Sequence, residues 1–177
     1  MPWKNGKGET VEIAVFPPGA SMDEFEWRIS MASVANDGAF SLFPEIDRTL
    51  SILSGHGMSL TIDGAAPVLL TMESDPLRFA ADVPVDATLV DGAITDLNVM
   101  TRRGRFVHSV ERRASSFSVH GCGLGETVCL MATGPVTFTS AGETVKLEAM
   151  DCVLVGEDAS VTAENIVCYE IRLQGAA

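Results

Sequence analysis

The stretch FEWRISMASV, residues 25–34, contains the clearest strand signal of the chain. Successive side chains of a β-strand point to opposite faces, so Trp27 and Ile29 lie on one face while Arg28 and Ser30 lie on the other. The first face is bulky and apolar, whereas the second is short and polar. This alternation predicts a strand that separates a hydrophobic core from a cavity.

Short strand signals recur on both sides of this stretch, and Gly, Pro and Asn-Asp turns separate them. They cover residues 11–15, 50–53, 58–62, 67–71, 87–90, 94–100, 126–139 and 166–173. We find no amphipathic helix pattern, and residues 23–25 and 45–48 would each form a single helical turn at most. Many short strands joined by turns predict an all-β protein.

The second half of the chain repeats the pattern of the first. Residues 49–61 and 126–139 each show a strand, a glycine turn and a second strand, and each half ends in a long alternating strand. Two copies of about six to eight short antiparallel strands predict two β-barrel or jelly-roll halves. We place the halves at residues 1–104 and 105–177.

The chain is acidic, with a formal net charge of −12 over 177 residues. An acidic surface repels a phosphate backbone, so we expect no nucleic-acid partner. The opening residues lack the apolar stretch of an export signal, and the longest apolar runs are far shorter than a membrane span. We therefore expect a soluble cytoplasmic protein without a membrane partner.

The histidines and cysteines do not form a metal-binding pattern. A metal site on a strand needs two histidines at period-two spacing, because that spacing places both imidazole rings on one face. No two of His56, His108 and His120 lie within ten positions, and the four cysteines contain no Cys-x-x-Cys pair. We expect neither a metal nor another cofactor, and we assign no catalytic residue.

Four blocks of sequence carry a family resemblance. They are PWKNGKGET at residues 2–10, FEWRIS and VANDGAFS within residues 25–41, FPEIDR at residues 43–48 and TDLNVMTRRG at residues 95–104. In this order the blocks resemble those of the HutD/Ves family of bicupin proteins. Two positions depart from the family pattern, because Lys7 and Glu45 stand where glycines are usual.

The resemblance implies a double-cupin fold and a role near histidine utilisation. Proteins of this family are thought to restrain that pathway by binding an intermediate such as N-formylglutamate or urocanate, with no demonstrated chemistry. Both a histidine-utilisation member and a stress-related Ves-like member fit the blocks. The two departures lie in loops nearest to the implied pocket, so they would alter which ligand this chain binds.

Polar residues on strand faces and in loops are the candidates for a ligand pocket in the first half. The resemblance implies that the opening segment covers this pocket; a frayed terminus, or Trp3 as a plug of the core, are the alternatives. Phe40 equally fits the core, and Arg102 fits either the pocket rim or a solvated arginine-rich connection over residues 102–113. The candidate ligand-binding residues are Trp3, Lys4, Asn5, Arg28, Ser30, Phe40, Ser41, Arg48, Asp96, Asn98 and Arg102.

An arginine inside a barrel needs a partner, because an unpaired buried charge costs several kcal/mol. For Arg28, Asp47 or Asp96 would form a structural salt bridge, whereas a ligand carboxylate would match the guanidinium bidentately. Arg48 has the same two alternatives. Asn98 would either donate to a ligand oxygen or bond the backbone.

These residues predict a non-catalytic protein that binds a small anionic metabolite through its carboxylate, and the family resemblance implies that it regulates histidine utilisation. Two other classes stay open. One is a cupin enzyme, metal-dependent or metal-free, in which Asp47, Asp96 and Arg48 would perform acid–base chemistry. The other is a structural protein whose second half forms a homodimer through its strand edges.

Overall fold

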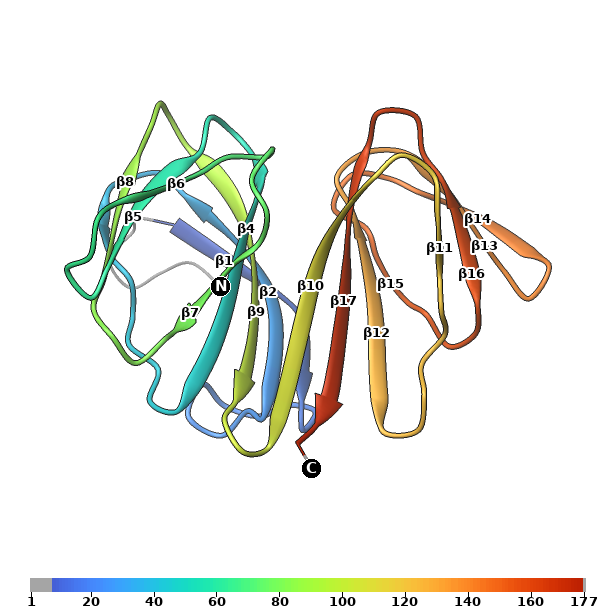
Figure 1. Cartoon of the computed structure of the whole chain (residues 1–177), viewed down its shortest axis with the longest axis horizontal. Helices are drawn as coiled ribbons and strands as arrows, with labels where there is room; N and C mark the ends of the chain where they lie inside the picture. Colours follow the sequence, from blue (N-terminus) through green and yellow to red (C-terminus); the bar gives the residue numbers. More distant parts are fainter. Residues whose placement is uncertain (1–7, 177) are drawn as a thin grey trace. The chain divides into compact units, whose positions relative to one another are not determined.

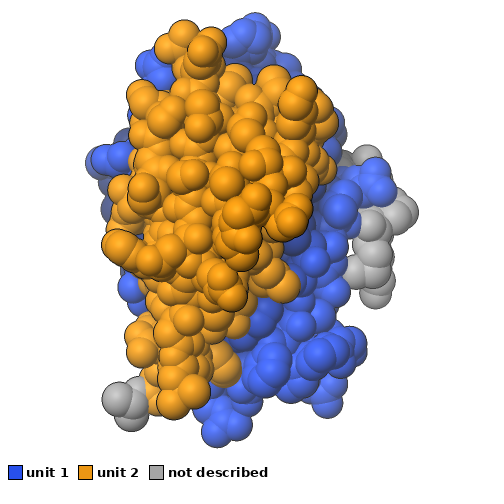
Figure 2. Space-filling view, turned by 90° about the vertical axis from the view of Figure 1, so that its right-hand side faces the viewer, with its two compact units in different colours: residues 1–105 blue, residues 106–177 orange. Residues whose placement is uncertain are grey.

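The computed structural model describes residues 8–176. In this part of the chain the regular structure consists of strands β1 to β17 and includes no helix (Figure 1). The all-β prediction is therefore confirmed. It also follows that the described residues contain no helix able to cross a membrane. The chain divides into two compact units, residues 1–105 and residues 106–177, which Figure 2 shows in blue and orange.

Unit 1 contains two antiparallel sheets. Sheet A has the strand order β1-β2-β9-β4-β7, and sheet B has the order β3-β8-β5-β6. In sheet A the strands are β1 Gly8–Phe16, β2 Trp27–Val34, β9 Ile94–Arg102, β4 Ile46–Ser54 and β7 Leu77–Ala80. In sheet B they are β3 Gly38–Ala39, β8 Val85–Leu89, β5 Met58–Ile62 and β6 Val68–Leu70.

The two sheets of unit 1 contribute alternate residues to one core. Leu50 and Ile52 of β4 are buried in the same cluster as Met58 and Leu60 of β5 and Phe79 of β7. Period-two spacing places each of the two pairs on a single strand face. Burying one such side chain contributes about 1.5–3 kcal/mol, so this cluster holds the two sheets face to face.

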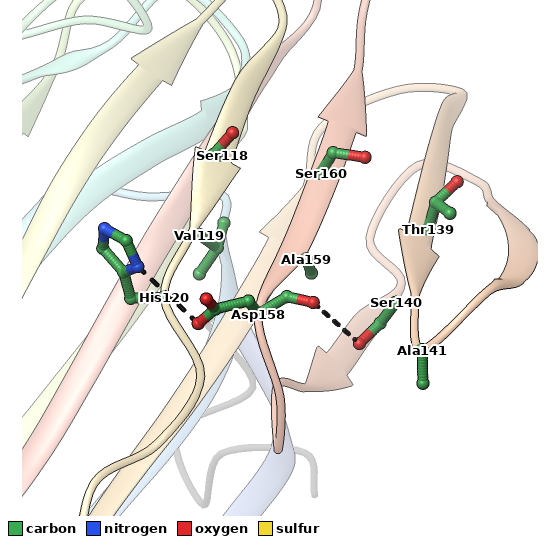
Figure 3. A pocket seen from close by; sticks show the side chains of 9 residues that line it. All are labelled: Ser118, Val119, His120, Thr139, Ser140, Ala141, Asp158, Ala159 and Ser160. Atoms are coloured by element: carbon green, nitrogen blue, oxygen red, sulfur yellow. Dashed lines mark hydrogen bonds and ion pairs between the residues drawn. The ribbon is translucent and has the colours of Figure 1, made fainter.

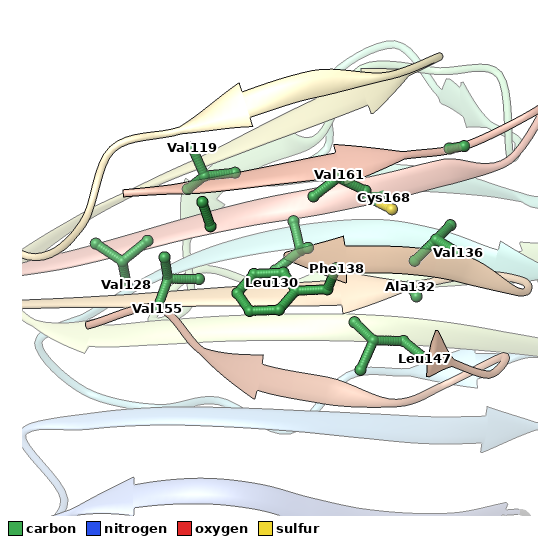
Figure 4. Packing of buried hydrophobic residues seen from close by; sticks show 12 residues of the cluster. Val119, Val128, Leu130, Ala132, Val136, Phe138, Leu147, Val155, Val161 and Cys168 are labelled. Carbon is green, nitrogen blue, oxygen red and sulfur yellow. The ribbon is translucent and has the colours of Figure 1, made fainter. Parts of the chain in front are cut away.

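Unit 2 is also built from two antiparallel sheets. Sheet C has the order β10-β17-β12-β15, and sheet D has the order β11-β16-β13-β14. In sheet C the strands are β10 Phe106–Ala114, β17 Val167–Gly175, β12 Glu126–Ala132 and β15 Cys152–Leu154. In sheet D they are β11 Phe117–Val119, β16 Ala159–Thr162, β13 Val136–Ser140 and β14 Glu143–Leu147. Leu130, Phe138 and Val161 form the centre of the core between these sheets (Figure 4).

The two units share one strand order. Without its edge strand β1, sheet A reads β2-β9-β4-β7, which corresponds strand for strand to β10-β17-β12-β15 of sheet C. Sheet B, β3-β8-β5-β6, corresponds in the same way to β11-β16-β13-β14 of sheet D. Strand β1 is therefore an addition to unit 1 that has no counterpart in the described part of unit 2.

Two segments differ from the sequence-based expectation. Residues 46–48, expected at most as a helical turn, begin β4, because pairing with β9 along the sheet overrides local preference. Residues 106–113, expected as part of the arginine-rich connection, lie in β10, which pairs with β17 over its whole length. The many polar residues of β10 give no alternating strand pattern, and its partner β17 is distant in sequence. The local sequence therefore does not predict this strand.

Candidate functional site

A group of polar side chains shares the inner face of sheet A in unit 1. Ser30 on β2 pairs directly with Asn98 on β9, and Asn98 also pairs with the core residue Leu50 on β4. Directly paired residues point to the same face, so these polar side chains face the core side of the sheet. We call the following six residues the polar cluster: Glu12, Arg28, Ser30, Arg48, Asp96 and Asn98.

Arg28 lies on this face, with only 4% of its surface exposed. Its Nε donates to Oε2 of Glu12 at 2.9 Å, and its Nη1 donates to Oγ of Ser30 at 3.1 Å. Strand β1 places Glu12 directly opposite Ser30. The expected structural partners, Asp47 and Asp96, are therefore replaced by Glu12, which the sequence analysis missed. The only sequence signal was an acidic residue inside the apolar run of residues 11–15.

Arg48 is held by an amide and by two aromatic rings. Its Nε donates to Oδ1 of Asn98 at 2.7 Å, and its Nη2 donates to the same oxygen. The guanidinium carbon lies 4.4 Å from the ring centre of Phe40 and 5.8 Å from that of Phe79. Cation–π attraction of this kind is worth more where water is excluded, and Arg48 is only 8% exposed.

Asn98 links Arg48 to a buried carboxylate. Its Nδ2 donates to Oδ1 of Asp96 at 2.5 Å, while its Oδ1 accepts from Arg48. Asp96 requires a donor and Arg48 requires an acceptor, so the two neighbours fix which end of the amide faces each of them. Arg48, Asn98 and Asp96 therefore form one hydrogen-bonded chain along the inner face of sheet A.

The burial of this chain shifts two pKa values. Burial raises the pKa of Asp96 to about 6, although the charge of Arg48 and hydrogen bonds from Asn98 and the Ala32 backbone oppose the shift. Burial also lowers the pKa of Arg48 to about 10. The negative charge of Asp96 opposes this decrease, whereas the positive charge of Arg28 adds to it. Arg48 therefore stays charged at neutral pH, whereas Asp96 titrates close to neutral pH.

The two guanidinium groups keep unused hydrogen-bond donors. Arg28 and Arg48 both pair with Met100, from opposite sides of β9. Adjacent strands lie about 4.8 Å apart, so the two backbones are about 10 Å apart. Among the described residues, Nη2 of Arg28 and Nη1 of Arg48 have no hydrogen-bond partner. These donors suit an acceptor with two oxygens.

Besides Phe40, which contacts Arg48, five predicted site residues are not members of the polar cluster. Trp3, Lys4 and Asn5 fall outside the described residues. Ser41 is exposed in the loop between β3 and β4. Arg102 donates from Nε to the Phe25 carbonyl at 3.1 Å and from Nη2 to the Asp23 carbonyl at 3.0 Å, so it anchors a loop.

Unit 2 carries a buried ion group on the matching sheet. Glu170, on β17, accepts hydrogen bonds from Nε of Arg113 at 3.0 Å and from Nε of Arg172 at 2.9 Å. Arg172 also donates to Oε1 of Glu126 at 3.1 Å and to the His120 carbonyl at 2.8 Å. We call Arg113, Glu126, Glu170 and Arg172 the unit 2 ion group. All three guanidinium nitrogens of Arg172 are thus occupied.

Two hollows in unit 2 are lined by residues that are not among the predicted site residues. The first, about 460 Å³, lies over sheet D, and the second is about 510 Å³. Figure 3 shows the first, which is lined by Ser118, Val119, His120, Thr139, Ser140, Ala141, Asp158, Ala159 and Ser160. Nδ1 of His120 lies 3.6 Å from Oδ1 of Asp158, and both side chains are more than 80% exposed. This solvated pair does not form a buried acid–base dyad.

Within residues 8–176, no group of three or more His, Cys, Asp or Glu side chains is placed to hold a metal ion. His56 lies in the turn between β4 and β5, where its Nδ1 is 3.2 Å from the Asp91 carbonyl oxygen. His108 is buried on β10, and His120 lies in the exposed loop after β11.

Comparison with known proteins decides the family. The HutD family model matches residues 1–168. The chain belongs to the HutD family. The resemblance inferred from the four sequence blocks is therefore confirmed.

Three relatives illustrate the range of similarity within the curated proteins. Protein Ves of Citrobacter koseri is 41% identical over 121 residues, which cover 67% of this chain and 61% of that protein. Protein Ves of Cronobacter sakazakii is 42% identical over 58% of this chain and 55% of its own length. These matches span less than two thirds of the Ves proteins. An uncharacterised 21.2 kDa protein in the hutC 3′ region of Pseudomonas putida is 34% identical, over 89% of this chain and 83% of that protein.

Solved structures agree with the family and the fold. HutD from Pseudomonas fluorescens SBW25, in a formate condition, gives a TM-score of 0.84 at 31% identity, covering 100% of this chain and 94% of that chain. A conserved protein of unknown function from Pseudomonas aeruginosa PAO1 gives a TM-score of 0.84 at 32% identity, covering 100% and 93%. A cupin 2 conserved barrel domain protein from Leptotrichia buccalis reaches 0.61 at 11% identity, covering 99% and 92%, which relates the fold alone to cupins.

Proposed function

We propose that this HutD-family protein is a non-catalytic receptor for a small carboxylate and that the ligand binds at the polar cluster of unit 1. One observation carries the proposal. Two buried arginines, Arg28 and Arg48, each have a guanidinium nitrogen on the core side of sheet A without a hydrogen-bond partner among residues 8–176, whereas all three guanidinium nitrogens of Arg172 in unit 2 have partners. A bound carboxylate would accept charge-assisted hydrogen bonds from these two nitrogens.

The chemistry of the cluster favours a carboxylate over other ligands. A guanidinium presents its N–H groups in a planar fork that matches two carboxylate oxygens. Each charge-assisted hydrogen bond contributes about 1.5–3 kcal/mol before desolvation is subtracted. Two or three such bonds correspond to affinities in the micromolar to millimolar range, which is suitable for sensing a metabolite.

Family membership supports a role in histidine utilisation. The chain belongs to the HutD family, and its Pseudomonas putida relative lies in the hutC 3′ region. Both N-formylglutamate and urocanate, the intermediates implied by the family resemblance, carry a carboxylate. We therefore place this receptor in the regulation of histidine utilisation, with one of these two compounds as its ligand.

A second function has one supporting observation. Asp96 has a pKa raised to about 6, which is the range expected of a general base that works near neutral pH. It is held by Asn98 and lies beside the unused donors. Turnover of N-formylglutamate or urocanate by the wild type, with loss of turnover in Asp96→Asn, would favour an enzyme over a receptor.

Thermal unfolding in the presence of candidate carboxylates tests the receptor proposal. Formate, glutamate, N-formylglutamate and urocanate are each added at millimolar concentration. A ligand at about ten times its Kd stabilises the fold by about 1.4 kcal/mol, which raises the Tm by about 3–6 °C in a protein of this size. We expect at least one of the four to produce such a shift.

Two variants connect this shift to the site. Arg48→Met removes the guanidinium but keeps an apolar side chain among Phe40 and Phe79, so the fold should persist while the ligand-induced shift disappears. Arg78→Gln is the matched control, because Arg78 is half-exposed and bonded to Asp47 on the other face of β4. The absence of any shift in the wild type with all four compounds would overturn the proposal.

A further inference from the structure

The polar cluster carries no net formal charge when all its groups are ionised. Glu12 on β1 and Asp96 on β9 are negative, whereas Arg28 on β2 and Arg48 on β4 are positive. The remaining members, Ser30 and Asn98, are neutral. The core residues that sheet B contributes opposite this face are apolar: Met58, Leu60, Leu70, Val85 and Ala87.

A bound carboxylate would disturb this balance. It would give the buried group a net charge of −1, and an uncompensated charge away from water costs several kcal/mol. Either a proton must enter with the anion or one of the two resident carboxylates must move into water. The structure distinguishes these two carboxylates by their exposure.

Building on the proposed function, we propose that the site binds its carboxylate together with one proton and that Asp96 accepts this proton. Asp96 is 1% exposed, so little water reaches its carboxylate to stabilise a negative charge. Asn98 donates to Asp96, and the amide oxygen of Asn98 already accepts from Arg48. Glu12 has a side chain that is 39% exposed, so its charge keeps contact with solvent.

The resting state of Asp96 agrees with this role. Burial raises its pKa to about 6, so it is largely ionised at pH 7.5 and only a small free energy separates it from the protonated form. A second negative charge bound at Arg48 raises the pKa further, because like charges disfavour ionisation. Protonated Asp96 still accepts from Asn98 through one oxygen, so the hydrogen-bonded chain is preserved.

Calorimetric titration with formate measures the proton directly. Formate is the smallest carboxylate and is fully ionised above pH 6, so any proton taken up must come from the buffer. The titration is run at pH 7.5 in PIPES, HEPES and Tris, whose ionisation enthalpies differ. We expect the observed enthalpy to vary linearly with the buffer ionisation enthalpy, with a slope of about 0.5–1 proton per formate.

The pH dependence of the affinity provides a second readout. Between pH 6.5 and 8.5 the Kd for formate should rise by up to about tenfold per pH unit, because one proton binds with each formate and the proton concentration falls tenfold per pH unit. In Asp96→Asn the site already has a net positive charge. This variant should bind formate more tightly at pH 8.5, with a nearly flat pH profile and no proton uptake.

A matched control removes the same charge elsewhere in unit 1. Asp86 is exposed on β8, and Asp86→Asn should retain the proton uptake and the pH profile of the wild type. Binding of formate with no proton uptake would overturn this inference and leave the proposed function intact, with movement of Glu12 into water as the compensation. If the wild type does not bind formate between pH 5.5 and 8.5, this inference fails, whereas the proposed function fails only if glutamate, N-formylglutamate and urocanate also produce no shift in Tm.

Discussion

Unit 1 and unit 2 have the same strand order, but the arginines on sheets A and C have different hydrogen-bond partners. Asn98 in unit 1 and Glu170 in unit 2 occupy matching places, since each pairs with a core leucine, Leu50 or Leu130. Glu170 is charged and accepts from two arginines, whereas Asn98 is neutral and accepts from Arg48 alone.

Under the proposed function, this one residue distinguishes the two groups. In unit 2 the Glu170 carboxylate accepts from both arginines, and all three guanidinium nitrogens of Arg172 have partners. In unit 1 the Asn98 amide accepts from Arg48 through one oxygen, and Nη1 of Arg48 has no partner among the described residues, so this nitrogen would be available to an external carboxylate. Repetition of a fold therefore does not repeat its site, because site chemistry depends on a few side chains.

The largest expected effect comes from neutralising the centre of the unit 2 ion group. Glu170→Gln would leave Arg113 and Arg172 beside a 4%-exposed amide, and breaking such a pair costs about 2–4 kcal/mol when the arginines are partly exposed. Urea unfolding measures the loss. Glu111→Gln, at a well-exposed acid that also contacts Arg113, should change stability by less than about 0.5 kcal/mol. Equal losses in the two variants would contradict the structural role of Glu170.

The reverse exchange brings the arrangement of unit 2 into unit 1. Asn98→Asp keeps the shape of the side chain and gives Arg48 a charged partner. We expect the affinity for carboxylates to fall by at least about tenfold, or 1.4 kcal/mol, because the guanidinium is neutralised internally and the site becomes negative. Titration with formate measures this, and circular dichroism checks the fold. Unchanged affinity in a folded Asn98→Asp protein would show that the amide does not define the site.

The pH dependence of stability should also differ between the two groups. The pKa of Asp96 is raised by burial to about 6, so its contribution to stability is absent at pH 7.5, grows as the pH falls through 6 and is complete below 3.8. The pKa of Glu126 is lowered, first by a hydrogen bond from the Gly123 backbone, so its contribution is constant above 4.5 and is lost below that value.

We therefore expect the wild type to gain about 1 kcal/mol relative to Asp96→Asn between pH 7.5 and pH 5, where Glu126 contributes no change. Urea unfolding of both proteins at a series of pH values provides the comparison. Parallel stability curves for the two proteins over this interval would be incompatible with a raised pKa at Asp96.

The smallest effect concerns the opposite face of β4. Ser51 pairs with Leu97, and its buried Oγ has no hydrogen-bond partner among the described residues. The corresponding face of β12 carries the apolar residues Cys129 and Met131 instead. Ser51→Ala should stabilise the protein by about 0.5–1 kcal/mol, since it removes a polar group that is buried without compensation. A decrease in Tm would show that Ser51 has a partner that the present structure does not display.

Strand alternation was sufficient to predict part of the polar cluster. Arg28 and Ser30 lie on one face because side chains alternate along β2, and the same parity unites Asp96 and Asn98 on β9. Glu12 could not be predicted as the partner of Arg28. Its position depends on the pairing of β1 with β2, which shifts register between Glu12 and Ala14, and no local pattern specifies such a shift.

Strand β10 and the contacts of Arg102 could not be predicted either, because both depend on residues that are distant in sequence. Strand β10 is rich in polar residues and half-exposed positions, so only its long pairing with β17 identifies it. Arg102 shares the sheet with the cluster, yet its guanidinium bonds the carbonyls of Asp23 and Phe25. Those carbonyls lie almost eighty residues earlier in the chain, and sequence alternation contains no information about contacts at that distance.

The rings of Phe40 and Phe79 beside the guanidinium of Arg48 have a consequence for selectivity. A free arginine side chain loses about 1.5–2 kcal/mol of rotamer entropy when a ligand immobilises it. Arg48 has already lost this freedom, because the rings and Asn98 hold it in one place. Under the proposed function, even a one-carbon acid would then bind. Discrimination between short and long acids would therefore depend on how well the remainder of each ligand fits the site.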